Sequence, residues 1–169
     1  MKLVALLAVA LAGCRKSAPP PTYEARQVLE EFKMTQTHLG RPAWTLGART
    51  AILKEDSKQA LLSEPRMEFI TNGKPTSRVR AASGLLHTDT HDLQLSTSVV
   101  VESLEDHSIL KTEELLYCDA KKLFETQAEI ELTRPGGVLK GRGLKAKPDL
   151  SEIRIFNQRS VITGEELKR

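Results

Sequence analysis

Alternation of apolar and polar residues is the feature that most limits how this 169-residue chain can fold. A period of two sends successive side chains to opposite faces, so each run predicts a strand with one buried and one solvated face. In the run 44–52, Trp44, Leu46 and Ala48 are expected to face inward, and Ile52 to continue that parity. The other alternating runs are 67–69, 78–81, 93–101, 109–117, 128–133 and 153–155.

Turn-forming residues separate these runs. Gly, Pro, Asn and Asp supply the positive or fixed φ that tight turns need. Such clusters occupy 39–42, 72–75, 105–107 and 134–137. Residues 24–37 could form a helix, but we favour a strand from about Leu29 that makes a hairpin with 44–52. Many short strands without a long helix indicate an all-β antiparallel sandwich, barrel or jelly roll.

The N-terminus has the layout of a secretory signal peptide. Lys2 precedes an apolar run, Leu3–Ala12, which is far shorter than the roughly 20 residues of a membrane-spanning helix. The tetrad 11–14 (Leu-Ala-Gly-Cys) resembles a bacterial lipobox. We therefore expect a signal peptide at 1–13 and a lipid anchor on Cys14.

The remainder of the chain divides simply. Residues 14–27 contain three consecutive prolines and predict an extended tether. Residues 28–163 are expected to form one domain, followed by a tail at 164–169. The net charge of +3 is spread without a basic stripe along the sequence, which argues against a nucleic-acid partner. If Cys14 is acylated, Cys118 has no partner for an internal disulfide.

Candidate catalytic chemistry is sparse. The sequence contains no Gly-rich phosphate loop and no nucleophile elbow. The best metal-ligating candidates are His87, Asp89 and His91, which would share one face of an unbroken strand. Because turn formers are dense there, we interpret 87–92 as a hairpin tip with solvated side chains. We predict no enzyme activity, metal or cofactor, and keep a metal-assisted enzyme as the minor alternative.

Taken in order, the alternating runs resemble the LptC family, the periplasmic component of lipopolysaccharide export, from about Leu29 to Ile162. The resemblance lies in the order and spacing of residues rather than in any single motif. The matching residues are Phe32, Gly40, Trp44-x-Leu46-x-Ala48, Pro65-x-Met67-x-Phe69, Gly73, Ser77-x-Val79-x-Ala81-x-x-Gly84, Leu93-x-Leu95-x-x-x-Val99-x-Val101-x-Ser103, Leu110-x-Thr112-x-x-Leu115-x-Tyr117, Thr126-x-x-x-Ile130-x-Leu132 and Gly141-x-Gly143-Leu144.

Two features depart from the family pattern. Better-known members carry an N-terminal membrane-spanning helix, whereas this chain has a lipobox; both devices tether a domain to a membrane. Residues 105–107 (Glu-Asp-His) also replace the expected Asp-Gly turn. That second difference affects one loop only.

The resemblance implies a slightly open antiparallel β-jelly roll, similar to the OstA/LptA-like domains. It implies that the domain takes lipopolysaccharide from the permease subunits of an inner-membrane ABC transporter and passes it to the next jelly-roll protein of a periplasmic bridge. The acyl chains would lie against inward-facing residues: Trp44, Leu46, Phe69, Val79, Leu95, Val99, Val101, Leu115, Ile130, Leu132, Ile153 and Ile155.

Two questions stay open from sequence. The alternative function is a lipoprotein scaffold or assembly factor with a closed β-sandwich and no lipid relay. The resemblance favours the periplasmic side of the inner membrane. Arg15 follows Cys14 in place of the Asp that retains many lipoproteins there, so an outer-membrane location is the second possibility.

Overall fold

The computed structural model describes residues 26–163, and within that range the chain forms strands and turns without a helix. The eleven strands are β1 (Arg26–His38), β2 (Arg41–Lys54), β3 (Gln59–Ser63), β4 (Arg66–Thr71), β5 (Lys74–Arg80), β6 (Ser83–His87), β7 (Leu93–Ser103), β8 (Ile109–Cys118), β9 (Leu123–Arg134), β10 (Gly137–Ala146) and β11 (Ile153–Thr163). The all-β prediction is therefore confirmed, including the strand in place of a helix before residue 38.

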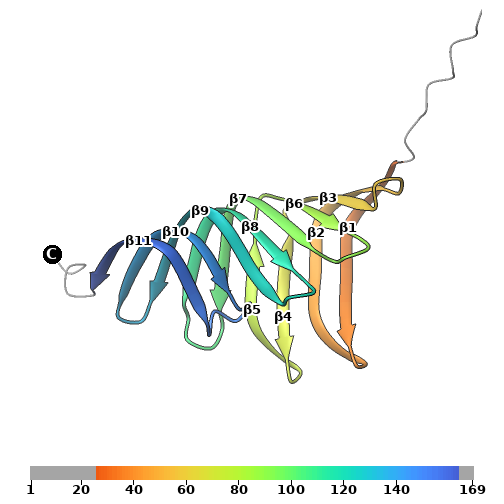
Figure 1. Cartoon of the computed structure of the whole chain (residues 1–169). Coiled ribbons are helices and arrows are strands. Elements are labelled where there is room, and N and C mark those ends of the chain that lie inside the picture. The colour runs from red at the N-terminus through yellow and green to blue at the C-terminus, as the bar shows by residue number, and fades with distance from the viewer. Residues whose placement is uncertain (1–25, 164–169) are drawn as a thin grey trace, which may run out of the picture.

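All the strands pair antiparallel in one folded sheet (Figure 1). Strands β3 and β4 lie end to end along β2, because Thr50–Lys54 pairs with β3 and Trp44–Gly47 with β4. In the same way β5 and β6 both pair with β7. The sheet then continues through β8, β9 and β10, and it ends at β1 on one side and at β11 on the other.

A crease crosses the strands near their middles. The register between β7 and β8 shifts between Ser96 and Val99, and Thr97 and Ser98 have positive φ there. Gly143 marks the same feature in β10, with φ +76 at a register shift against β9. Extra residues of this kind bend a strand and increase its twist, so they let long strands turn from one layer into the other.

The crease divides the sheet into two facing layers. The β4–β5 layer contains those two strands together with Trp44–Gly47 of β2 and the C-terminal half of β7. The β3–β6 layer contains those two strands together with Thr50–Lys54 of β2 and the N-terminal half of β7. The hairpin turns at the far ends of the strands form the rim, opposite the crease.

The inward parity of β2 changes at the crease. In β2, Trp44, Leu46 and Ala48 are buried as expected, but Ala51 is buried next and Ile52 is only half-buried. The prediction that Ile52 keeps the parity of Trp44 was therefore wrong. Thr97 has the parity of Leu95 and Val99 but is exposed, because it lies in the bulge of β7. Beyond the bulge, Val99 and Val101 are buried with the same parity as Leu95, so the inward parity of β7 is kept.

The predicted turns are confirmed. Leu39–Gly40 joins β1 to β2, Asn72–Gly73 joins β4 to β5, 104–108 joins β7 to β8, and Pro135–Gly136 joins β9 to β10. Residues 88–92 join β6 to β7, so the segment 87–92 forms a hairpin tip as interpreted from sequence. The expectation that its side chains are solvated was wrong for His91 and Asp92, which are half-buried and contact Trp44 and the backbone of Asp119. The core lies between the two layers, where 23 apolar side chains form one buried cluster.

Candidate functional site

The space between the layers is an apolar interior that we call the trough. Ten of the twelve predicted interior residues are buried there: Trp44, Leu46, Phe69, Val79, Leu95, Val99, Val101, Leu115, Ile130 and Leu132. None of these ten is more than 6% exposed, so the middle of the trough is filled by its own side chains. Ile153 and Ile155 are half-buried and pack against the cluster from β11.

The trough is less covered at both ends of the sheet. Leu29, Phe32 and Met34 of β1 are half-buried and pack against the cluster at one end. Ile153 and Ile155 take the same place on β11 at the other end. Both strands pair on one side only, so their outer N–H and C=O groups can accept a further strand. Apolar side chains and free strand edges therefore occur together at each end.

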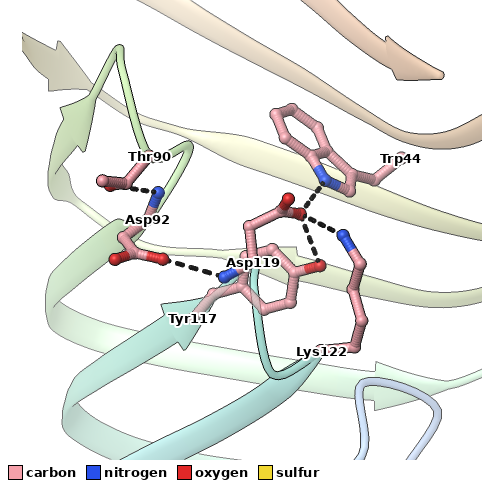
Figure 2. A network of polar contacts seen from close by, with 6 residues as sticks. All are labelled: Trp44, Thr90, Asp92, Tyr117, Asp119 and Lys122. Carbon is pink, nitrogen blue, oxygen red and sulfur yellow. Dashed lines mark hydrogen bonds and ion pairs between the residues drawn. The ribbon is translucent and has the colours of Figure 1, made fainter. Parts of the chain in front are cut away.

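A polar network, which we call the latch, closes the rim between the layers (Figure 2). Asp119, in the turn after β8, accepts hydrogen bonds on Oδ1 from Trp44 Nε1 at 3.0 Å and from Tyr117 Oη at 3.0 Å. The same oxygen is 2.7 Å from Lys122 Nζ. Trp44 belongs to the β4–β5 layer, whereas Asp119 follows the half of β8 that extends the β3–β6 layer. The latch thus joins the two layers.

The turn between β6 and β7 also contacts the latch. The backbone N–H of Asp119 donates to Asp92 Oδ1 at 2.8 Å (Figure 2). The ring of His91 lies edge-on to the indole of Trp44, with the ring centroids 6.4 Å apart. The segment 87–92 therefore positions the latch, and no cluster of three metal-ligating side chains occurs within the described range 26–163.

Aromatic contacts strengthen the closure. Phe69 of the β4–β5 layer meets Tyr117 and Phe124 of the opposite layer edge-on, at centroid distances of 4.9 and 5.4 Å. Each such pair contributes about 0.5–1.5 kcal/mol beyond its buried area. A second polar contact lies farther along the rim, where Arg134 Nη2 donates to the carbonyl oxygen of Leu150 at 2.7 Å. The rim is therefore closed at two places.

The electrostatics of the latch favour an ionised Asp119. Burial alone would raise the pKa of this carboxyl, but the hydrogen bonds from Lys122, Trp44 and Tyr117 outweigh it and hold the pKa below its usual value. Burial and the adjacent Asp119 charge raise the pKa of Tyr117, so its hydroxyl keeps the proton that it donates. The latch is thus a carboxylate surrounded by donors.

Sequence reasoning placed Trp44 in the interior but missed Asp119. The two residues are 75 positions apart, and the segment Asp119–Lys122 reads as an ordinary polar turn. The only local signal is that a lone tryptophan at an inward position needs a partner for its N–H. The predicted signal peptide, Cys14, most of the tether and the tail 164–169 lie outside the described residues. Within 26–163, no helix has the length and apolar character to cross a bilayer.

The folded antiparallel sheet, with an apolar interior and one free strand edge at each end, defines a domain of the β-jelly-roll class. A family comparison matches residues 3–162 to the lipopolysaccharide-assembly, LptC-related family. The match covers nearly the whole chain, so this protein belongs to that family. No curated protein matches the chain at a significant level.

Membership defines the general role of the chain. The family acts in lipopolysaccharide transport as a transport and scaffold component, and it is not known for enzymatic activity. It works in the periplasm, in association with the inner membrane, together with lipopolysaccharide and the other proteins of the export bridge. This chain therefore has a role in lipopolysaccharide transport.

Proposed function

We propose that the trough holds the acyl chains of lipopolysaccharide and relays them from the permease subunits of an inner-membrane ABC transporter to the next jelly-roll protein of the bridge. The observation that carries this proposal is that half-buried apolar side chains and a free strand edge occur together at each end of the sheet. A jelly roll added at either edge would continue both the sheet and its apolar interior.

Because the middle of the trough is packed, lipid binding requires the layers to separate at the rim. Acyl chains would then replace contacts that apolar side chains now make with each other. An acyl chain of about 12 carbons gains on the order of 10 kcal/mol on leaving water, at roughly 0.8 kcal/mol per methylene. The hydrogen bonds of the latch contribute roughly 1–3 kcal/mol each. Lipid entry can therefore offset the opening of the latch.

Photo-crosslinking tests the relay directly. A benzoyl-phenylalanine at Phe32 or Ile155, which face the trough at its two ends, should capture lipopolysaccharide in cells. The matched controls are Thr35 and Arg154, which are exposed on the same two strands. Adducts at all four positions, or at none, would contradict the relay.

The packed middle favours a second candidate, a scaffold that joins bridge proteins without carrying lipid. Tyr117 and Phe124 meet Phe69 across the trough, as expected of a permanently closed sandwich. The two candidates differ in what lipid does to the chain. In a relay, added lipopolysaccharide changes the fluorescence of Trp44, the only tryptophan. In a scaffold, the emission stays constant while the bridge still assembles.

We also propose that a lipid on Cys14 anchors the domain to the inner membrane after removal of residues 1–13. The support is the Leu-Ala-Gly-Cys tetrad behind a short apolar run. Cys14→Ser should abolish acylation, which mass spectrometry of the intact protein would detect, and should release the domain or leave it unprocessed. An unchanged mass and membrane fraction would contradict this anchor.

A further inference from the structure

The outer face of the β4–β5 layer carries a row of basic side chains, close to the crease. Lys33, Gly47, Arg66, Arg80, Val100 and Lys111 are consecutive register partners on β1, β2, β4, β5, β7 and β8. Four of these six residues are cationic and none is acidic. We call this row, with the hollows along it, the basic groove.

Two arginines at its centre lie directly opposite each other. Arg66 of β4 is the register partner of Arg80 on β5, and both are exposed. Directly opposed like charges destabilise a sheet. Neither guanidinium has a hydrogen bond or ion pair with another residue of the described range 26–163.

The nearby carboxylates lie outside the row: Glu68 and Glu102 line the central hollow from the adjacent row, on either side of Arg78. Glu68 Oε2 is 2.9 Å from Arg78 Nε, in the adjacent row of the same face. Glu131 lies beyond Lys111 along the row, and its contact with Lys111 is 3.8 Å, whereas Lys140 approaches it to 2.9 Å. Four cationic side chains line the central hollow against two carboxylates, so the centre of the basic groove keeps an excess of positive charge.

The surface is hollowed along this row. A hollow of about 530 Å³ is lined by Arg66, Arg80 and Lys111, with Val100 and Ile109 also in its wall. A second hollow of about 370 Å³ lies over Gly47, between Lys33 and Arg66. Glu31 and Glu64 also line it, and Glu64 forms an ion pair with Arg49. The two share Arg66 and Thr45. They exist because Gly47 and Val100 are small, whereas their neighbours along the row are long.

We propose that the basic groove is a binding site for phosphate esters, with one phosphate held between Arg66 and Arg80 and flanked by Lys33 and Lys111. Strands in a sheet are about 4.8 Å apart, so the two guanidinium groups can both reach one phosphate. Each planar guanidinium can donate two parallel hydrogen bonds to phosphate oxygens. The anion would also remove the repulsion between the two arginines.

The phosphate group that this site would bind occurs in more than one kind of molecule. A phospholipid headgroup, a phosphorylated sugar and free phosphate all present the same oxygens. The Val100 and Ile109 side chains add an apolar wall, which suits an amphiphile over a small ion. The site lies on the opposite side of the sheet from the trough, so it goes beyond the relay proposed above and does not depend on it.

Titration with glycerol 3-phosphate, followed by NMR of the arginine Nε–H groups in the complete protein, tests the site. Saturable shifts are expected for Arg66 and Arg80. Arg66→Gln should weaken the affinity at least fivefold without lowering the melting temperature, since it removes one of two repelling charges. Arg154→Gln, an equal loss of charge on the opposite layer, is the matched control.

Gly47→Thr provides a test that leaves charge unchanged. A Cβ at Gly47 would have no neighbour closer than 3.7 Å, so the strand tolerates a side chain there. The threonine would fill the hollow between Lys33 and Arg66. It should therefore weaken glycerol 3-phosphate binding several-fold while lipid cross-linking from Phe32 in the trough continues. That separation distinguishes the basic groove from the relay.

Vesicle binding distinguishes a lipid headgroup from a soluble phosphate ester as the ligand. Binding to phosphatidylcholine vesicles containing 30% phosphatidylglycerol, lost in Arg66→Gln and competed by glycerol 3-phosphate, would identify a lipid headgroup. Binding of glycerol 3-phosphate without vesicle binding would identify a soluble phosphate ester. The proposal is overturned if neither probe shifts Arg66 or Arg80. It is also overturned if Arg154→Gln weakens binding as much as Arg66→Gln, because the attraction would then be a property of total charge.

Discussion

The indole N–H of Trp44 donates to the carboxylate of Asp119 across the rim, at 3.0 Å, and so joins the two layers of the folded sheet. Trp44 is 1% exposed, and the same carboxylate oxygen also receives the Tyr117 hydroxyl. Any lipid that enters the middle of the trough through the rim must part these groups. The latch is therefore both a contribution to stability and a barrier to loading.

Asp119→Ala should lower the free energy of unfolding by about 2–4 kcal/mol. The change leaves two buried donors, the Trp44 indole and the Tyr117 hydroxyl, without their acceptor. Urea unfolding followed by Trp44 emission would measure it. Asp56→Ala, in the exposed turn between β2 and β3, is the control and should change stability by less than about 0.5 kcal/mol. Equal losses in the two variants would show that the latch does not hold the layers together.

The latch should weaken in acid. The folded-state pKa of Asp119 lies below the ordinary value of 3.8. Its contribution to stability is therefore present above that ordinary value, and it is lost as the pH falls through the folded-state pKa. The stability difference between wild type and Asp119→Asn should be constant from pH 7 to about pH 5 and should shrink below about pH 4. A difference that stays the same at pH 3 would contradict the assigned ionisation.

The strands and turns could be predicted because their signals are local. Alternation within β7 and the Asn72–Gly73 turn each act over a few residues. The crease could not be predicted, because Thr97 and Ser98 read as ordinary strand residues and their left-handed backbone depends on both layers. The error at Ile52 also arises at the crease, where the inward parity of β2 changes between Ala48 and Ala51.

Contacts between residues far apart in the sequence could not be predicted either. Asp119 and Trp44 come together only when the sheet folds over, and Arg66 faces Arg80 only in the observed register. The interior residues were easier, since parity alone places Val99 and Ile130 inward. Parity gave no indication that the middle of the trough is packed while its ends, at Phe32 and Ile155, are partly open.

The packed middle and the open ends should respond differently to a buried charge. Val99 is 1% exposed, so Val99→Asp places a carboxylate in the core without a partner and should unfold the domain. Ile155→Asp, at the half-buried end of the trough, should leave the domain folded but block lipid transfer. Circular dichroism would measure folding, and lipopolysaccharide export in cells would measure transfer. A folded Val99→Asp variant would show that the trough is open to water along its whole length.

The free edge at β11 should depend on a single glycine of β10. A Cβ at Gly141 would lie 2.6 Å from Ile155 Cγ2 and 2.8 Å from the carbonyl oxygen of Asn157, both on β11. These distances are too short for real contacts, and the second involves backbone, which a side-chain rotation cannot relieve. Gly141→Ala should therefore displace β11 and cost about 1–3 kcal/mol, as overpacking does. Hydrogen exchange should become faster for the amides of β10 and β11 and stay slow in β7.

Gly47→Ala is the matched control, because a Cβ there has no neighbour closer than 3.7 Å. The comparison also tests the role of the edge. If β11 receives the next jelly roll, Gly141→Ala should reduce pull-down of the bridge protein, while a cross-linker at Phe32 on the opposite edge still captures lipid. Normal pull-down from a domain whose β11 exchanges rapidly would mean that the bridge is joined elsewhere. In that case β1 would be the edge to test next, because it is the other strand of the sheet that pairs on one side only.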